Sequence, residues 1–324
     1  MQGGCLVGGR APDRRMVCST LGLVLLGACL APAASAAGYR TANFIVDAPT
    51  ETLARRIGDA AEQYRHDLAI EWTGQPLPRW SRPCPIQAQV APNLGAGGAT
   101  SFVFDKGEVF NWTMTIQGSE QRILDSVLPH EITHTIFASH FRRPLPRWAD
   151  EGACTTVEHP VERARQHRLL IEFLTTGRGI AFPQMFAMRE YPADVLPLYS
   201  QGYSLARYLI ERGGRHKYVA FVGDGLVADD WSGALAKHYG VTSVPQLQHT
   251  WLEWVKLGCP APPASVALAS ITATDWSRMP RGQSPDGVPP PATVATPAAI
   301  ATTAGRRSIY ASQARRAPEP ADVR

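Results

Sequence analysis

Residues 128–137 read LPHEITHTIF and contain the pattern His-Glu-x-x-His. In a helix, residues four positions apart lie on one face with their Cβ atoms about 5–6 Å apart, so His130 and His134 can both reach one metal ion. Imidazole nitrogens bind Zn²⁺ at about 2.0–2.1 Å. Glu131 follows the first histidine and can take a proton from a water molecule at the metal. The stretch predicts a helix that carries a metal site and a carboxylate base.

A second motif follows at short range, where residues 144–153 read PLPRWADEGA and carry Trp-x-x-Glu-Gly. A catalytic zinc site has three protein ligands and one open position, and two histidines with one glutamate form a common set. Together the two motifs resemble those of the gluzincin metallopeptidases, the clan of thermolysin and the zinc aminopeptidases, and most of all its peptidase MA-like branch. The resemblance implies Zn²⁺ as cofactor, His130, His134 and Glu151 as its ligands, and Glu131 as general base.

His140 offers a different third ligand, because it lies ten residues after His130, as in the metzincin pattern. That pattern has a glycine between the second and third ligands, where the chain reverses in a left-handed conformation. This chain has Phe137 there, where a positive φ would be unusual. A helix that continues instead turns His140 away from the metal, so we expect it at the surface or behind the ligands. Asp150 and Cys154 are further candidate ligands.

Residues 198–209 read LYSQGYSLARYL. They resemble the Tyr-x-x-Gly segment of gluzincin aminopeptidases, in which the tyrosine donates a hydrogen bond to the oxyanion of the tetrahedral intermediate. The resemblance implies this role for Tyr199, with Tyr203 as the alternative. The residues themselves are equally consistent with aromatic side chains on the buried face of an amphipathic helix, and both interpretations stay open.

Alternating polarity predicts strands before these motifs, at Asn43–Asp47 and Ile86–Val90. Between them, apolar residues at helical spacing predict a long helix over residues 49–72. Ser101–Phe104 and Glu108–Ile116 indicate a β-hairpin. In gluzincins an edge strand lies along the active-site cleft, and the resemblance implies that role for the second hairpin strand, from Val109. An extended peptide could bind there by strand addition.

Nearly the whole chain after Glu120 reads as helix. Strands first and helices after are typical of an α+β fold. We therefore expect mixed N-terminal strands with a long helix, followed by a mostly helical zincin-like lobe. The upper α/β lobe would span about 38–140 and the helical lobe about 141–258.

Pro129 is unexpected inside this helical stretch. A proline in a helix interior removes one backbone hydrogen bond and clashes with the preceding turn, at a cost of about 3 kcal/mol. Ile123 and Val127 nevertheless continue the apolar periodicity upstream. We expect the helix to kink just before His130 rather than to begin afresh near Ser126, and both arrangements leave the two histidines beyond the proline.

The N-terminus resembles a bacterial-type export signal, because arginines precede an apolar run over about residues 16–30 that is too short to span a membrane. Residues 34–36 read ASA and form a signal-peptidase site. We therefore expect an export signal over residues 1–36 and a periplasmic or extracellular product. The alternative is a lipobox at residues 26–29, LGAC, which would make the protein a lipoprotein anchored to the membrane through Cys29.

Beyond Cys259 the chain is rich in Ala, Pro, Thr and Arg with little apolar periodicity, which predicts a disordered tail over residues 259–324. The remainder, 37–258, has the size of one domain. The net charge of +4 is modest and does not imply binding to nucleic acid. In an exported protein Cys84, Cys154 and Cys259 can form one disulfide, but the sequence does not select the pair.

The sequence as a whole predicts an exported zinc metallopeptidase that acts on a peptide or protein substrate. Residues 95–99 read GAGGA and lack the glutamate with which zinc aminopeptidases hold the substrate's amino terminus, which favours an endopeptidase. The alternatives are a metzincin-like peptidase that uses His140 and a non-catalytic, zinc-stabilised envelope binding protein. Glu131 argues against the latter, since a structural zinc site needs no base. The oligomeric state is not indicated.

Overall fold

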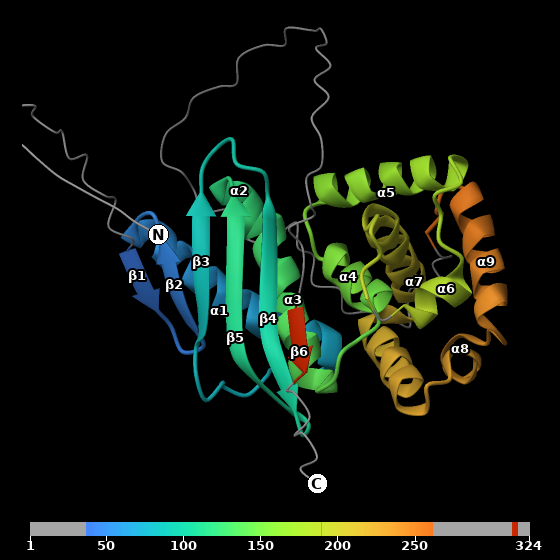
Figure 1. The fold of residues 1–324 in the computed structure, drawn as a ribbon, viewed down its shortest axis with the longest axis horizontal. Coiled ribbons are helices and arrows are strands. Elements are labelled where there is room, and N and C mark those ends of the chain that lie inside the picture. The colour runs from blue at the N-terminus through green and yellow to red at the C-terminus, as the bar shows by residue number, and fades with distance from the viewer. Residues whose placement is uncertain (1–36, 189, 262–312, 317–324) are drawn as a thin grey trace, which may run out of the picture. The chain divides into compact units, whose positions relative to one another are not determined.

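The computed structural model describes residues 37–188, 190–261 and 313–316. The strands of these residues form one mixed sheet in the order β1-β2-β3-β5-β4-β6 (Figure 1). Their bounds are β1 Ala37–Arg40, β2 Phe44–Ala48, β3 Cys84–Val90, β4 Gly97–Asp105, β5 Glu108–Gly118 and β6 Gln313–Arg316. Pairing is parallel between β2 and β3, between β3 and β5, and between β4 and β6, and antiparallel elsewhere.

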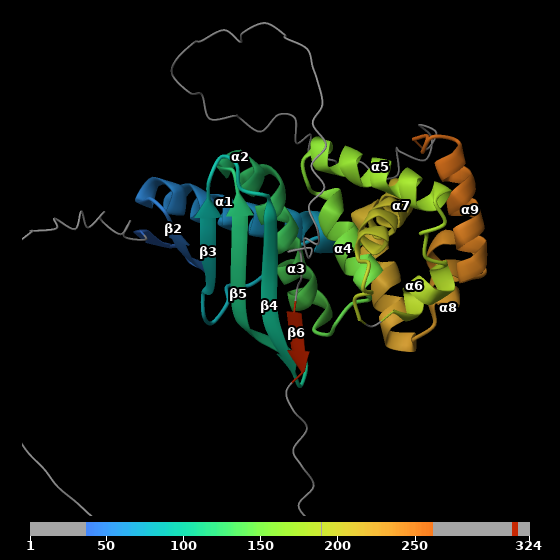
Figure 2. The ribbon, with the colours of Figure 1, turned by 45° about the horizontal axis from the view of Figure 1, so that its top comes forward.

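Helix α1 lies between β2 and β3 and the other helices follow β5, so the predicted α+β class is confirmed. Their bounds are α1 Glu51–Thr73, α2 Glu120–Arg122, α3 Leu128–Phe141, α4 Arg147–Thr156, α5 Pro160–Thr175, α6 Phe182–Ala187, α7 Leu196–Ala228, α8 Trp231–Tyr239 and α9 Val244–Lys256. Figures 1 and 2 show α1 and α3 behind the sheet, and α4 to α9 gathered beside it. The chain passes from one group to the other between α3 and α4.

Helix α1 lies close to the predicted range of 49–72 and has clear signals at both ends. The Thr50 hydroxyl accepts a hydrogen bond from the amide of Leu53, and Gly74 ends the helix in the left-handed conformation. Its buried face packs toward α3, where the rings of Trp72 and Phe137 meet edge to face at 5.0 Å. Trp72 also meets the ring of Tyr218 on α7, with centroids 6.1 Å apart, so α1 packs on both α3 and the helical group.

The hairpin of β4 and β5 forms as predicted, but the place of β5 in the sheet corrects the sequence analysis. Met114 of β5 is paired on one side with Ile86 of β3 and on the other with Thr100 of β4. The expectation that Val109–Ile116 forms an edge strand along the site was therefore wrong. The strand nearer to α3 is β4, and it begins at Gly97 rather than at Ser101.

Pro129 lies at the second residue of α3, directly after a π-helical turn at Ile123–Val127. In this wider turn the amide of Leu128 bonds to the carbonyl of Ile123, five residues back. The same pattern would pair residue 129 with Leu124, but proline has no N–H. The hydroxyl of Tyr64 on α1 donates to the Leu124 carbonyl instead, at 2.9 Å. The interruption expected at the proline thus takes the form of a π-helical turn.

Several expectations fall on residues that the structure does not describe. The export signal over 1–36, with Cys29, lies outside the described residues, as does most of the predicted tail. Residues 313–316 of that tail form β6, which composition did not predict. Cys84, Cys154 and Cys259 are buried and free, so no disulfide joins them. Within the described ranges, no helix is long and apolar enough to cross a membrane.

Candidate metal centre

Helices α3 and α4 bring the two sequence motifs together in the interior of the protein. Every side chain from Leu128 to Ala138 on α3 is buried, as expected for an apolar helix enclosed by other elements. His130, Glu131 and His134 are therefore buried, and so is Glu151 on α4. Polar groups buried in this way need partners that replace water.

The three predicted ligands converge at one point. The Oε2 atom of Glu151 lies 3.5 Å from Nε2 of His130 and 3.7 Å from Nε2 of His134. Ligand atoms around a tetrahedral zinc with bonds of about 2.0–2.1 Å stand about 3.3–3.4 Å apart, so the spacing suits a metal of that size. Oε2 of Glu151 is buried and makes no hydrogen bond with the described residues. We call His130, His134 and Glu151 the ligand triad.

The outer ring nitrogen of each histidine meets a second carboxylate. Nδ1 of His130 lies 2.7 Å from Glu158, and Nδ1 of His134 lies 2.8 Å from Asp150. A carboxylate at Nδ1 keeps the proton on that nitrogen, so Nε2 is the nitrogen that would bind a metal. Asp150 thus lies behind a predicted ligand, and the described geometry does not place it as one.

The acids around the histidines favour positive charge in this pocket. Burial alone lowers the pKa of His130, but the adjacent carboxylates of Glu151 and Glu158 outweigh burial and raise its pKa well above the usual value. Burial likewise lowers the pKa of His134, but Asp150 and Glu151 outweigh burial, so the pKa is raised. An environment that attracts protons onto two buried histidines will also attract a cation.

Cys154 is a second possible partner of the histidines, because His130, His134 and Cys154 form a group that could hold a metal ion. Its sulfur lies 3.3 Å from Nδ1 of His134, the nitrogen that Asp150 already engages. Burial raises the pKa of the Cys154 thiol well above its usual value, and Asp150 with other nearby carboxylates raises it further. Since metals bind the thiolate, these neighbours favour the carboxylate of Glu151 over the sulfur as third ligand.

Glu131 lies beside the triad and faces strand β4. Its Oε2 atom accepts a hydrogen bond of 2.6 Å from the hydroxyl of the buried Thr100. A Cβ atom at Gly98 would stand 2.5 Å from Oε1 of Glu131, so only glycine lets the carboxylate approach the strand so closely. Burial raises the pKa of Glu131, while His134 and His130 oppose that change. The arrangement holds an acid–base group next to the point where the ligand atoms meet.

Two tyrosines approach the triad from the segment around the start of α7. Tyr191 hydrogen-bonds through its hydroxyl to Oε1 of Glu151, and the guanidinium of Arg147 lies 4.4 Å from its ring centroid. The ring of Tyr199 stacks on that of Tyr191, with centroids 6.4 Å apart. Burial raises the pKa of Tyr199 well above its usual value, followed by the charge of Glu151. Tyr203 instead lies near the charged side chains of Arg207 on α7 and Arg163 on α5.

His140 does not join this group. It is exposed near the end of α3, which continues as a helix through Phe137 to Phe141. Its ring packs edge to face on Phe141. No chain reversal brings it toward the other histidines, so the described geometry gives no support to the metzincin ligand set.

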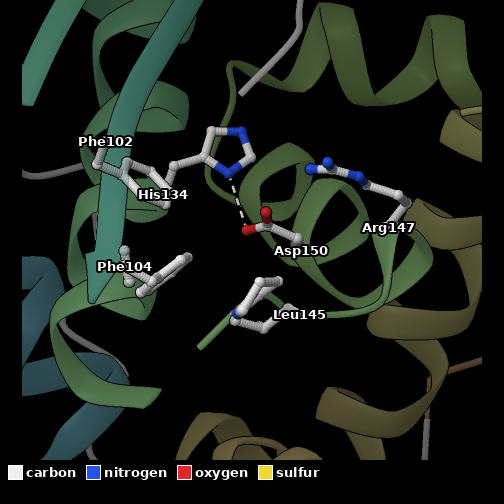
Figure 3. Close-up of a pocket in the computed structure, with 8 residues that line it drawn as sticks. Phe102, Phe104, His134, Leu145, Arg147 and Asp150 are labelled. Carbon is white, nitrogen blue, oxygen red and sulfur yellow. Dashed lines mark hydrogen bonds and ion pairs between the residues drawn. The ribbon is translucent and has the colours of Figure 1, made fainter. Parts of the chain in front are cut away.

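A small pocket opens beside His134 (Figure 3). Phe102 and Phe104 of β4 line it on one side, and Arg147 and Asp150 of α4 on the other. The pocket therefore lies between the strand that faces Glu131 and the helix that carries Glu151. A chain laid along β4 would pass this pocket.

Thr100, Glu158 and Tyr191 are the site residues that the sequence analysis did not identify. Glu158 lies seven residues after Glu151 and two residues past the end of α4, close enough in sequence to be a usable signal. Thr100 and Tyr191 come from a strand and a connecting segment far away in sequence, and no local pattern marks them.

Comparison with known proteins does not identify the chain. No protein-family model matches it, and no curated protein matches it. The functional assignment therefore depends on the two motifs and on the geometry of the residues that they bring together.

Proposed function

We propose that this protein is a zinc-dependent peptidase of the gluzincin type. The observation that carries the proposal is the convergence of one carboxylate oxygen and two imidazole nitrogens of the ligand triad, with Glu131 directly beside them. A site meant only to hold structure usually closes with a fourth protein ligand and has no use for an adjacent base. Zn²⁺, when bound, supplies a Lewis acid that polarises a carbonyl and acidifies water.

The residues of the chain have separate tasks in this proposal. The triad holds the metal, while Glu158 and Asp150 orient the two imidazoles. Glu131 takes a proton from the attacking water and gives it to the leaving amine. Tyr199, buried next to the triad, donates a hydrogen bond to the oxygen that becomes negative in the transition state.

The substrate class and location are part of the same proposal. Gly98 of β4 presents backbone near Glu131, and residues 95–99 carry no carboxylate that would hold a free amino terminus, which supports an endopeptidase. We propose export through the signal over residues 1–36. The intact mass of the mature protein tests this, since a chain that begins at Ala37 is secreted and a lipidated Cys29 is anchored.

The Glu131→Gln variant separates catalysis from metal binding. We expect it to keep about one zinc per chain and to lose hydrolysis of casein and of a quenched peptide library by several orders of magnitude, because proton transfer in both directions is lost. Zinc is measured by elemental analysis of the same sample. Glu172→Gln, an exposed site on α5, is the matched control and should keep both properties.

Ordinary turnover in the Glu131→Gln variant contradicts the proposal. A wild-type chain that binds zinc but cleaves none of these substrates supports the zinc-stabilised binding protein instead. Cleavage that persists after the metal is removed with a chelator excludes a metallopeptidase.

A further inference from the structure

Strand β4 has one edge that does not face β5, and this edge belongs to the strand that borders the metal site. Thr100 on β4 donates to Glu131, and Phe102 two residues later lines the pocket beside His134 (Figure 3). The side chains of β4 therefore reach both the base and a metal ligand. Any chain that pairs with the outer edge of β4 runs past the catalytic residues.

The structure shows an occupant on this edge. Residues 313–316 form β6, which pairs with β4 in parallel, from Ser101 opposite Gln313 to Phe104 opposite Arg316. Figures 1 and 2 both show β6 along β4, on the side away from β5. The pairing begins one residue after Thr100, so it covers the part of β4 that runs past the pocket.

The backbone groups of a strand edge can bond to only one partner at a time. An extended peptide that adds to a sheet uses the unpaired N–H and C=O groups of the edge strand. The groups of Ser101–Phe104 that an added substrate needs are the groups that face β6. Occupation by β6 and binding of an extended peptide at these residues therefore exclude each other.

We propose that the segment Gln313–Arg316 is a built-in competitor that covers the peptide-binding edge of β4 and restrains the activity of the site. This inference rests on the proposed peptidase function. Because the segment belongs to the same chain, its local concentration near β4 exceeds that of a free peptide, and a short strand suffices to compete. A substrate binds only after it displaces β6, and loss of the segment leaves the edge of β4 available to substrate.

The test uses the full chain with the double substitution Ala314→Pro and Arg315→Pro. Successive N–H groups of a strand point to opposite sides, so one of two adjacent prolines removes the N–H that faces β4. Gly305→Pro with Arg306→Pro is the control, because it adds two adjacent prolines and removes the same single charge outside β6. Zinc content is measured for each protein.

Three readouts are compared. Hydrogen exchange at the amides of Ser101–Phe104 that face β6 should become at least tenfold faster in the β6 variant and stay unchanged in the control, while the amides that face β5 stay protected in both. A labelled peptide with the sequence of residues 311–318, ASQARRAP, should bind the β6 variant at least fivefold more tightly than it binds the unaltered chain. The kcat/KM for peptide hydrolysis should rise at least fivefold, with zinc content constant.

Unchanged exchange in the β6 variant shows that the pairing is absent and overturns the inference. Faster exchange without tighter peptide binding shows that β6 pairs but does not compete, which also overturns it. If exchange and binding change as expected while no zinc-loaded protein hydrolyses any peptide, the competition stands and the proposed peptidase function fails. Faster exchange and tighter binding with an unchanged kcat/KM in an active enzyme overturn the regulatory role.

Discussion

Each imidazole of the ligand triad meets a carboxylate at both of its ring nitrogens. Glu158 and Asp150 lie at the Nδ1 atoms, and Glu151 lies at both Nε2 atoms. With Glu131, four buried carboxylates surround two histidines. Buried charge is costly unless it is paired or coordinates a metal, so a divalent cation would relieve the excess of negative charge. The chemistry of the donor set therefore fits zinc.

The outer carboxylates can be tested without touching the ligands. Glu158→Gln should weaken zinc binding about 10-fold to 100-fold, because the amide holds the imidazole of His130 less firmly and makes it a weaker donor. Asp150→Asn should act similarly through His134. Affinity is measured by competition with a chelating dye. Equal affinity in both variants and in the exposed control Glu172→Gln would mean that these contacts do not support a metal.

The two histidines could be predicted from sequence because their spacing is local, whereas Glu151 was expected from the resemblance of the second motif. Two histidines four residues apart on one helix need no knowledge of the remaining fold. Thr100 and Tyr191 could not be predicted in this way. Their contacts with Glu131 and Glu151 depend on how a strand and a connecting segment pack against α3 and α4.

At the level of elements, α4 and α7 cross with unusually close backbones. A Cβ atom at Gly152 would stand 2.2 Å from the carbonyl oxygen of Gly202, and one at Gly202 would stand 2.8 Å from that of Trp148. Gly152 follows the ligand Glu151, and Gly202 belongs to the segment that carries Tyr199. The two glycines thus bring the third ligand and the tyrosine close together.

Gly152→Ala should separate these two helices. We expect the free energy of unfolding to fall by about 1–3 kcal/mol, because the added methyl group meets backbone that cannot rotate away. Zinc affinity should fall as well, since Glu151 moves with α4. Gly223→Ala on α7 is the control, because its nearest neighbour would lie at an ordinary 3.7 Å and alanine favours a helix by up to about 1 kcal/mol. Denaturant unfolding measures the stability of both variants. Equal stability of the two variants would contradict the close crossing.

The sheet shows which part of the fold the sequence could not supply. Alternation of polarity located β2, β3 and the hairpin but not β1 or β6, since it reports which side chains face the core. It does not report which neighbour a strand pairs with, and so β5 was expected at the edge when it lies between β3 and β4. Pairing of β3 with β5 requires contacts between Ile86 and Met114 that no local pattern encodes.

In the described part of the chain as a whole, the site lies where the sheet and the helical group meet. Thr100 and the two histidines belong to the first group, and Glu151 with Tyr199 to the second. A metal at the triad would join the two groups, so its binding should stabilise the folded protein by mass action. The same position puts the outer edge of β4 and the adjacent pocket next to the residues proposed to be catalytic.

Thermal unfolding of the full chain measures this coupling. Free zinc at 100 times its dissociation constant should stabilise the protein by about 2.7 kcal/mol, which corresponds to a rise in Tm of about 5–10 °C over the chelator-treated protein. The rise should disappear in Glu151→Ala, and Mg²⁺ should not reproduce it because the triad offers nitrogen donors. An equal rise in Glu151→Ala would place the metal elsewhere.

The most direct test of the ligand triad is X-ray absorption at the zinc edge of the purified full chain, combined with the zinc content of the same sample. We predict about one zinc per chain and a first shell of nitrogen and oxygen only, at about 2.0–2.1 Å. That result would fit His130, His134 and Glu151. A sulfur shell near 2.3 Å would assign the third position to Cys154, and a chain that binds no zinc would contradict the account altogether.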